Sequence, residues 1–296
     1  MTNTSVLGLL LLFKAAFAVE GFSASSTPST TSNNAQLKAE LLTRIQKLRT
    51  LKERDGDFSV DFGVKGGEID KKSRAPQKLD FYTISNDVGV AADEVMEITS
   101  ELQKCSPIDN PTQYLGDKEK GKEAPLNGEW KLLFTTAADA NFSKNSKRGS
   151  ASVKNVVDAC KGSITNVIDF QGESTSDEGT TSKKEPLVKQ LNVVIGAKPA
   201  SESRVGLQFK YAKVVFNRFF GWKRQWNLYI PVPAPLITRL IVFFSRVFRK
   251  KGKKVPPKAY FDVLYLDNDL RVQRTGEDNL FVQAKPTWED AVPFFT

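Results

Sequence analysis

The sequence contains no histidine at all. Histidine is the commonest general base, the commonest metal ligand and the side chain that changes charge near neutral pH. Cysteine is almost as scarce, since Cys105 and Cys160 lie far apart and in no metal-type spacing. We interpret them as two free thiols, although the sequence does not show whether they pair. A zinc site or a Ser-His-Asp hydrolase is therefore excluded or nearly so.

Acidic residues are missing from one long tract. Between Ser203 and Phe261 there are 14 Lys and Arg and no Asp or Glu, while the rest of the chain has 29 bases against 34 acids. A basic tract on an otherwise slightly acidic protein indicates a surface that meets anions. The remaining composition is that of a soluble globular protein, with 20 Phe, and 296 residues suit one domain with extensions.

The N-terminus also lacks basic residues before its apolar run, Val6–Phe13, which is too short to span a bilayer. Small residues follow, and Ala16-Phe17-Ala18 resembles a cleavage site, so residues 1–18 are interpreted as a signal peptide. Residues 19–35 are rich in Ser and Thr, are predicted to be disordered, and are typical of a transit peptide. Together they resemble the bipartite presequence of algae with complex plastids. A plain secretory signal followed by a disordered spacer is the alternative.

Residues 36–124 are predicted to form a helical region with a polar insertion. A first helix starts near Ala35, with an apolar face formed by Leu37, Leu41, Leu42, Ile45, Leu48 and Leu51, and Gly56 ends it. A second helix follows Asn86 or Asp87 as its cap, with an apolar stripe of Val88, Ala91, Val95, Ile98 and Leu102. Both stripes are expected to face the core.

The period changes to two at Asn127-Gly128. Trp130, Leu132 and Phe134 alternate with Lys131, Leu133 and Thr135, which predicts a half-buried strand. Further strands are predicted at 163–170, 187–195, 205–209, 214–216, 260–266, 270–274 and 279–284. A polar hairpin is predicted between the strands at 163–170 and 187–195. About eight short strands favour a mainly β fold, an antiparallel barrel spanning 125–285, followed by a tail at 286–296.

The acidic segment Asp267-Asn268-Asp269 is interpreted as a turn. Asp and Asn supply the side-chain hydrogen bonds that tight turns need, and Thr275-Gly276-Glu277-Asp278 is the next turn. A metal site on the two aspartates, or a pair of catalytic carboxylates, is a weaker alternative.

Arg274 does not fit the turn interpretation. It shares a strand face with Leu270 and Val272, so it points inward if they do. A buried guanidinium requires a partner, and Trp130 on the first strand is the natural one, because closure of a barrel brings first and last strands together.

Three blocks of sequence together resemble the plastid lipid-associated protein, or fibrillin, family. They are "LKAELLTRI" with a later "ELQKCSPIDNPT", "LNGEWKLLFTT" with "GSITNVIDF", and "LYLDNDLRVQRTGEDNLFV". Gly128-Glu129-Trp130 is also similar to the G-x-W signature of lipocalins, in which a late-strand Arg packs on the Trp. Thr275 stands where the family usually has Gly.

The resemblance implies a lipocalin-like barrel in plastids, at thylakoid membranes or plastoglobules. It implies no enzymatic activity and no cofactor, and binding of hydrophobic metabolites such as prenyl quinones and carotenoids. The residues that we assign to ligand binding or barrel closure are Trp130, Leu132, Phe134, Arg271, Arg274 and Phe281.

Residues 236–258, "PLITRLIVFFSRVFRKKGKKVPPK" from Pro235, combine an apolar body with a basic rim. This is typical of an interfacial helix that docks on an anionic membrane or droplet surface. The predicted docking residues are Arg246, Phe248, Arg249, Lys250, Lys251, Lys253 and Lys254. A core helix is an alternative, and a single-stranded nucleic-acid groove is a weaker one, since no recognisable RNA-binding motif is present. The preceding Pro231, Pro233 and Pro235 indicate an apolar loop or edge that could serve as a lid.

The sequence therefore predicts a plastid protein that binds lipids in a barrel. A structural droplet coat with a packed barrel, an enzyme of lipid metabolism, and a nucleic-acid binder remain as alternatives. The volume of the side chains inside the barrel discriminates the first two.

Overall fold

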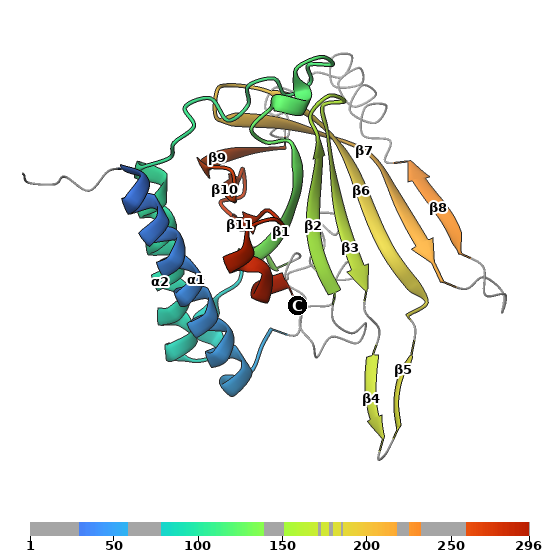
Figure 1. Cartoon of the computed structure of the whole chain (residues 1–296). Coiled ribbons are helices and arrows are strands. Elements are labelled where there is room, and N and C mark those ends of the chain that lie inside the picture. Colours follow the sequence, from blue (N-terminus) through green and yellow to red (C-terminus); the bar gives the residue numbers. More distant parts are fainter. Residues whose placement is uncertain are drawn as a thin grey trace, which may run out of the picture.

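The computed structural model describes residues 30–58, 78–138, 151–170, 173–177, 180–184, 186–217, 225–231 and 259–295. The fold has two layers, and Figure 1 shows a pair of helices lying against one side of a curved sheet. The helices are α1 (Thr30–Asp55) and α2 (Asn86–Lys104). Short 3-10 helices occur at Phe81–Thr83, Gly121–Glu123 and Glu289–Phe295.

The two helices form because each carries one continuous apolar stripe. The predicted core positions Leu41, Ile45, Val95 and Leu102 are all buried. The cap of α2 was predicted at Asn86 or Asp87, one or two residues too late: Ser85 is the N-cap, and its Oγ accepts a hydrogen bond from the Val88 amide. The same Ser85 hydroxyl donates a hydrogen bond to Asp55 Oδ2, and this bond joins the end of α1 to the start of α2.

The strands form one nine-stranded antiparallel sheet and a separate hairpin. The sheet order is β6-β3-β2-β1-β11-β10-β9-β7-β8, and β6 also pairs with β7, so eight strands close a ring. The strands are β1 (Gly128–Thr135), β2 (Ala151–Asp158), β3 (Ser163–Phe170), β4 (Glu173–Asp177), β5 (Thr180–Lys184), β6 (Val188–Pro199), β7 (Arg204–Phe216), β8 (Trp226–Pro231), β9 (Tyr260–Leu266), β10 (Leu270–Thr275) and β11 (Leu280–Ala284). The mainly antiparallel β fold with an N-terminal helical region is confirmed, whereas the likeness to lipocalins stays a prediction.

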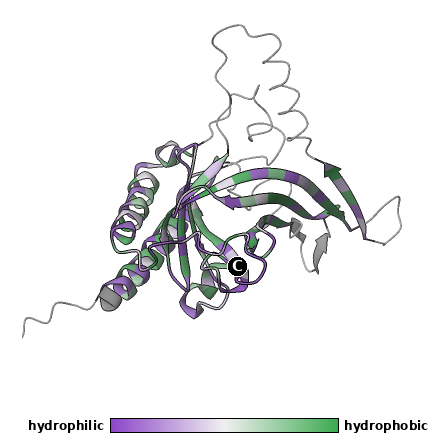
Figure 2. Cartoon of the chain, turned by 90° about the horizontal axis from the view of Figure 1, so that it is seen from above, coloured by the Kyte–Doolittle hydropathy of each residue, from purple (hydrophilic) through white to green (hydrophobic). Residues whose placement is uncertain are grey.

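Strand β7 is shared between two neighbours on one of its edges. Its first three residues, from Arg204 to Gly206, pair with β9 and close the ring. Its last six, from Tyr211 to Phe216, pair with β8 instead. Figure 2 shows β6 and β7 running away from the helices, with β8 on the far side. Among the described residues, β8 therefore extends the sheet beyond the ring as an edge strand.

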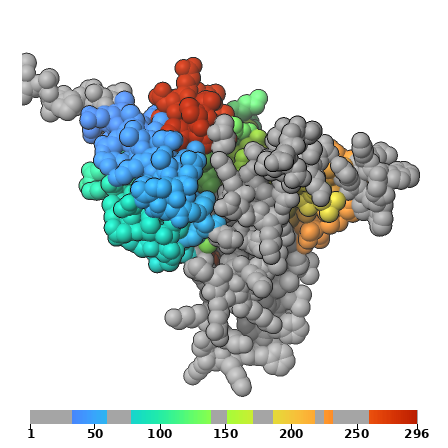
Figure 3. Space-filling model, turned by 90° about the horizontal axis from the view of Figure 1, so that it is seen from below, coloured from blue at the N-terminus to red at the C-terminus, as the bar shows by residue number. Residues whose placement is uncertain are grey.

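The buried side chains form two clusters. The helix-side core fills the space between α1, α2 and the outer face of β9, β10, β11 and β1, and it contains Tyr265, Leu270, Val272 and Val282. The second cluster lies inside one end of the ring and contains Trp130, Val157, Ile164 and Leu266. Seen from below, the helices and the C-terminal segment gather on one side of the molecule and β8 lies on the other (Figure 3).

That end of the ring is covered by the connection from α2 to β1. Leu115, Ala124 and Leu126 from this connection are part of the second cluster. Gly121 sits against the β2–β3 turn so closely that a Cβ would lie 2.6 Å from the Cys160 nitrogen. We call this the covered end, and the end nearer to the β4–β5 hairpin the hairpin end.

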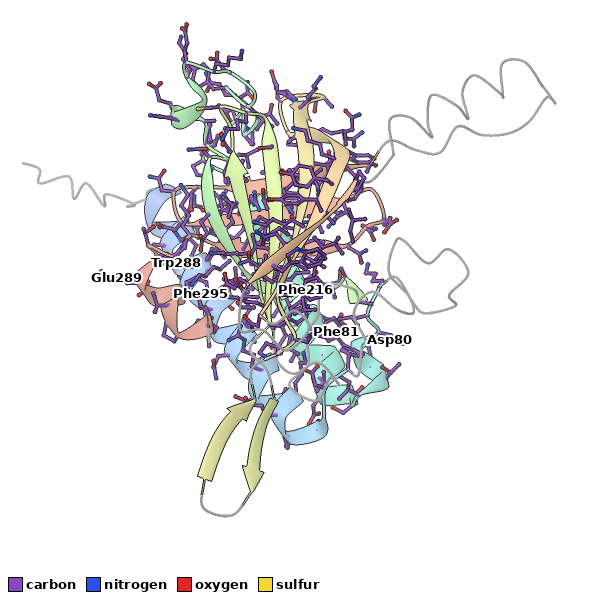
Figure 4. The ribbon with its side chains drawn as sticks, turned by 90° about the vertical axis from the view of Figure 1, so that its right-hand side faces the viewer. Asp80, Phe81, Phe216, Trp288, Glu289 and Phe295 are labelled. Carbon is purple, nitrogen blue, oxygen red and sulfur yellow. The ribbon has the colours of Figure 1, made fainter. Side chains whose placement is uncertain are left out.

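The C-terminal 3-10 helix packs beside α1. Figure 4 shows Trp288 and Phe295 on this segment, next to the helix. Lys38 of α1 lies over the Trp288 ring at 4.8 Å, and Arg49 donates a hydrogen bond to the Phe294 carbonyl. The tail predicted at 286–296 is thus part of the folded structure as far as Phe295.

Two strands are absent from the sequence-based prediction. β2 was not predicted, and β8 was interpreted only as an apolar loop or edge. The predicted strands at 205–209 and 214–216 are one continuous strand, β7. The polar hairpin is confirmed as β4–β5. The presequence and the basic segment 236–258 lie outside the described residues.

Candidate lipid-binding site

The acidic turn after β9 anchors the first helix. Asp267 Oδ1 accepts hydrogen bonds from the amides of Asp269 and Leu270, at 2.8 and 2.7 Å, which is the turn chemistry expected from the sequence. Lys38 Nζ reaches across from α1 to Asp267 Oδ2 at 3.0 Å and to Asp269 Oδ2 at 2.7 Å. Tyr265 Oη donates to the same Asp267 Oδ2 at 2.7 Å. These acids are engaged in holding the turn and the helix.

The pKa values at this turn follow from those contacts. Burial by itself would raise the pKa of Asp267, but hydrogen bonds from Tyr265, from the two backbone amides and from Lys38 hold it below its ordinary value. Burial likewise opposes the charge on Lys38, yet its bonds to Asp269 and Asp267 raise the pKa of the lysine. The turn is therefore a charged, satisfied unit at neutral pH.

Arg271, and not Arg274, is the arginine that packs on Trp130. The Arg271 guanidinium lies 5.0 Å from the Trp130 ring centroid, and the residue is 1% exposed. The Arg274 side chain is 46% exposed and forms an ion pair with Asp278 at 3.5 Å. The prediction for Arg274 was wrong because Leu270 and Val272 point toward the helices, so the face that they share with Arg274 is the outer one.

The inward face of β10 carries Arg271 and Gln273. Arg271 pairs directly with Gln283 of β11 and with Leu266 of β9, and Leu266 belongs to the cluster inside the ring. Both faces of this strand are buried, from Leu270 to Gln273. Alternation alone then does not tell which face points into the ring.

Four polar side chains form a chain of hydrogen bonds across the inside of the ring, which we call the polar cluster: Arg271, Gln283, Asn155 and Asn166. Arg271 Nε and Nη2 donate to Gln283 Oε1 at 3.0 and 2.5 Å, and Nη2 also donates to Asn155 Oδ1 at 2.8 Å. Gln283 Nε2 donates to Asn155 Oδ1 at 2.5 Å, and Asn155 Nδ2 donates to Asn166 Oδ1 at 2.7 Å. The cluster links β10, β11, β2 and β3.

Trp130 supplies the aromatic ring on which the Arg271 guanidinium of the polar cluster packs. It is fully buried, and its Nε1 donates a hydrogen bond to the Leu126 carbonyl at 2.9 Å. Gly128 precedes it with φ +114°, a conformation that favours glycine and turns the chain into the strand. Lys285 Nζ also lies 5.0 Å from the Trp130 ring centroid.

The other predicted residues of this group take different positions. Leu132 pairs with Gln283 and faces inward, half-buried. Phe281 pairs with Gln273 and also faces inward, half-buried. Phe134 does not follow Trp130 and Leu132: an irregularity in the pairing with β11 between Leu132 and Phe134 moves it to the helix-side core. There it stacks on Phe81 at 5.8 Å between ring centroids.

A row of directly paired apolar residues lies beside the polar cluster, toward the hairpin end. The apolar row consists of Val153, Ile168, Leu191, Val214 and Leu228, from β2, β3, β6, β7 and β8. A second row of directly paired residues lies two positions closer to the covered end. It consists of Asn155, Asn166, Val193, Ala212 and Ile230, from the same five strands. By alternation both rows are on the same face as Val157 and Ile164 inside the ring.

Exposure of the apolar row rises toward β8. Ile168 is 5% exposed, Val153, Leu191 and Val214 are half-buried, and Leu228 is 36% exposed. Trp226 and Ile230, which share the Leu228 face, are 40% and 45% exposed, and Trp226 packs on Phe216 with ring centroids 5.8 Å apart. An apolar strip thus leads from the interior of the ring to an exposed strand.

The outer face of the same strands mixes polar and apolar residues. Asp169 Oδ1 accepts a hydrogen bond from Gln190, and Gln190 Oε1 accepts one from Asn192. Val167 and Val215 lie on the same outer face and are buried. The inner face carries the continuous row of paired apolar residues, which makes it the candidate surface for an apolar ligand.

Comparison with known proteins identifies the family of this chain. The family model described as PAP_fibrillin matches residues 84–284, from the start of α2 to the end of β11. The chain belongs to the PAP_fibrillin family. This family indicates a plastid lipid-associated protein, with plastoglobule association, and its members are structural proteins rather than enzymes. No curated protein and no solved structure matches the chain.

Three other features were named from the sequence: the docking residues, the two cysteines and a metal site. The predicted docking residues Arg246, Phe248, Arg249, Lys250, Lys251, Lys253 and Lys254 lie outside the described residues. Cys105 and Cys160 are separate, half-buried free thiols. Within the ranges that the structure describes, no cluster of Cys, Asp and Glu is placed to hold a metal ion, and no helix is long and apolar enough to cross a bilayer.

Sequence reasoning missed Gln283, Asn155, Asn166 and the face of β8. Asn155 stands between Val153 and Val157 in an alternating segment, which is a recognisable signal of a polar group on an inward face. The segment was not predicted as a strand, although it is as long as β1 and β3. The alternating prolines from Pro231 onward led to the interpretation of an apolar loop or edge. The six residues of β8, which end at Pro231, nevertheless pair with β7.

Proposed function

We propose that this PAP_fibrillin protein binds or shields long hydrophobic molecules, such as prenyl quinones or carotenoids, at thylakoid membranes or plastoglobules. The observation that supports this most directly is the apolar row, which ends in the exposed side chains of β8. Water around these side chains is replaced when an apolar molecule lies along them, and burial of each large side chain contributes about 1.5–3 kcal/mol.

The basic segment supplies the second half of the proposal. It begins within five residues of the last residue of β8, Pro231, so the chain that leaves the apolar face continues directly into a sequence of the interfacial type. Cations in "RKKGKK" attract an anionic surface by about 1 kcal/mol each, and this attraction weakens with salt. In this proposal the segment places the β8 face against a membrane or droplet.

The ligand is tested by lipid extraction from the full chain after incubation with a total plastid lipid extract. Leu228→Asp together with Ile230→Asp puts two charges on the inner face, and we expect the lipid recovered per protein to fall at least about tenfold, since two buried apolar contacts are lost. Tyr229→Asp is the matched control, because Tyr229 lies between them on the outer face and is 57% exposed.

Mass spectrometry of the extract identifies the ligand. A stoichiometric prenyl lipid or carotenoid that is retained by Tyr229→Asp and lost from the double variant supports the proposal. Equal amounts in all three proteins, or no lipid in any of them, contradict it.

Membrane docking is tested by flotation of the full chain with phosphatidylcholine vesicles, with and without phosphatidylglycerol. Replacing Lys251, Lys253 and Lys254 by Gln removes about 3 kcal/mol of attraction, so binding to the anionic vesicles is expected to weaken about 100-fold. The matched control replaces the exposed Lys118, Lys120 and Lys122, which also removes three charges. Equal losses in both variants would show that net charge alone directs binding.

A structural droplet coat with a filled interior is the second candidate function. The packed cluster at the covered end favours it, since Trp130, Leu266 and their neighbours leave that end filled with side chains. A protein that floats with vesicles and droplets but yields no extracted lipid would fit this candidate. If a phosphate polymer displaces the protein from the vesicles, and no lipid is extracted from the protein, nucleic-acid binding would be favoured instead.

A further inference from the structure

Arg271 is a buried cation that is only partly satisfied. Its Nε and Nη2 donate to neutral amide oxygens of Gln283 and Asn155, whereas Nη1 is buried and has no hydrogen-bond partner among the described residues. Buried polar groups are nearly always hydrogen-bonded, and an unmade bond from a charged group is costly. The free donor therefore calls for an acceptor that the chain itself does not supply here.

No carboxylate balances the charge of Arg271 in the described part of the chain. Burial alone lowers its pKa to about 9, with no acidic neighbour acting in the opposite direction. Lys285 Nζ and the Arg271 guanidinium each lie 5.0 Å from the centroid of the Trp130 ring. No ion pair of either cation is present among the described residues, so the surroundings of the Trp130 ring carry an excess of positive charge there.

The surroundings of Arg271 connect it to the apolar row. Leu132, Phe281 and Asn166, which face inward next to the polar cluster, are only half-buried, so the interior is not fully filled at this level. Val153 and Ile168 of the apolar row lie one inward position further toward the hairpin end than Asn155 and Asn166. Gln273 Oε1, also inward-facing on β10, is a second buried atom without a partner in the described residues.

We propose that Arg271 Nη1 binds the anionic oxygen headgroup, a carboxylate or a phosphate, of an amphipathic lipid whose chain lies along the apolar row. The inference rests on the proposed lipid-binding function and specifies the class of lipid. Nη1 is the nitrogen left to donate, and a hydrogen bond from a guanidinium to an ionised oxygen is stronger than one to a neutral oxygen.

A purely structural role for Arg271 makes a different prediction. Stacking on Trp130 requires the face of the guanidinium, and the bonds to Gln283 and Asn155 use Nε and Nη2; neither needs a free Nη1. If packing were the whole role, the chemistry of a lipid headgroup would not affect binding.

The decisive experiment measures dissociation constants of the unmodified full chain by calorimetry. The probes are oleate, oleoyl lysophosphatidate, oleyl alcohol and methyl oleate, all below their micelle concentrations, so that the chain is constant and the headgroup varies. We expect one or both anions to bind about 10- to 100-fold more tightly than the alcohol and the ester, the effect of one hydrogen bond to a charged group. The first two probes distinguish a carboxylate from a phosphate.

Variants then assign the preference to Arg271. Arg271→Gln is expected to bring the affinity for the anion down to that for the alcohol, and Arg271→Lys to retain part of the difference because it keeps the charge. Arg274→Gln is the matched control, since it removes the same charge from an exposed position on the same strand and should leave the preference unchanged. Thermal unfolding of each variant shows whether it is folded.

The outcomes separate the two proposals. Equal binding of all four probes leaves lipid binding intact and overturns the headgroup assignment. Failure of all four to bind, together with an empty lipid extract, overturns the proposed function itself. Should Arg271→Gln not fold, the comparison of probes on the unmodified chain still decides, and an anion preference that persists in a folded Arg271→Gln would also overturn the assignment.

Discussion

The two sides of the ring use their strands in opposite ways. On β10, backed by the helices, four consecutive residues are buried, so both faces of the strand are enclosed. On β8, at the far side of β7, all six residues are exposed, although three large apolar side chains share one face. The comparison teaches that apolar residues hold the fold together on the first side and are left exposed on the second.

The family model spans both sides of the ring, and the most specific of the three sequence blocks lies on the helix-backed side. The segment "LYLDNDLRVQRTGEDNLFV" spans β9, β10 and β11, and most of its apolar residues contact the helices or the covered end. Its aspartates hold Lys38 and the turn. Much of the signature therefore joins the sheet to the helices, while Arg271, Gln273 and Phe281 are members of it that face the interior of the ring.

The largest expected effect separates two leucines that occupy strands on the opposite sides. Leu270→Ala removes a fully buried side chain between sheet and helices, and the free energy of unfolding should fall by about 2–5 kcal/mol. Leu228→Ala removes a side chain that is 36% exposed on β8, and the change should stay within about 0.5 kcal/mol. Urea denaturation at pH 7 measures both.

Similar losses from the two leucine variants would break the comparison. They would mean that β8 is packed as tightly as β10, and that its inner face is not available to a ligand. A smaller loss of lipid from Leu228→Ala than from Leu270→Ala, both measured on folded protein, would argue in the same direction.

A smaller effect is expected at the charged turn that fixes α1 to the sheet. Lys38→Met leaves Asp267 and Asp269 without their shared cation, and we expect a loss of about 2 kcal/mol near pH 7. Because the folded-state pKa of Asp267 is lowered, its contribution is present above the unfolded pKa and disappears as the pH falls through the folded value. The difference between variant and parent should therefore shrink toward acidic pH.

The upper limit of that pH window follows from Lys38. Its folded-state pKa is raised, so its contribution is present below the unfolded value and is lost as the pH rises through the folded one. Urea denaturation from acidic to alkaline pH should show a plateau of the difference in the neutral range. A difference that does not depend on pH would show that Lys38 acts through packing on Trp288 instead.

The sequence predicts the scaffold better than the site, for a physical reason. The helix stripes, the strands β1, β3 and β9 and the turn at Asp267 follow from periodicity and turn chemistry, which are local. Which face of β10 enters the ring depends on where the helices pack, and that contact joins residues far apart in the chain. For this reason Arg274, rather than Arg271, was predicted to pack on Trp130.

Two further errors come from departures from strict alternation. Phe134 was placed on the inward face because a regular strand would put it there, but the irregularity in the pairing with β11 moves it to the other side. The polar cluster could not be assembled in advance, since Asn155 and Gln283 lie on strands whose shared neighbour, β1, becomes apparent only when the ring closes.

The short seam between β7 and β9 has a consequence for the range of ligands. Three residue pairs fasten the ring there, and beyond them β7 continues with β8, whose pairing in the described residues is to β7 alone. The covered end of the ring is therefore closed by pairing between β7 and β9, whereas nearer the hairpin end the same edge of β7 pairs with β8 instead. For the proposed lipid ligand, we expect this difference to make the protein discriminate more by the chemical group held near the covered end than by the width of the hydrocarbon tail.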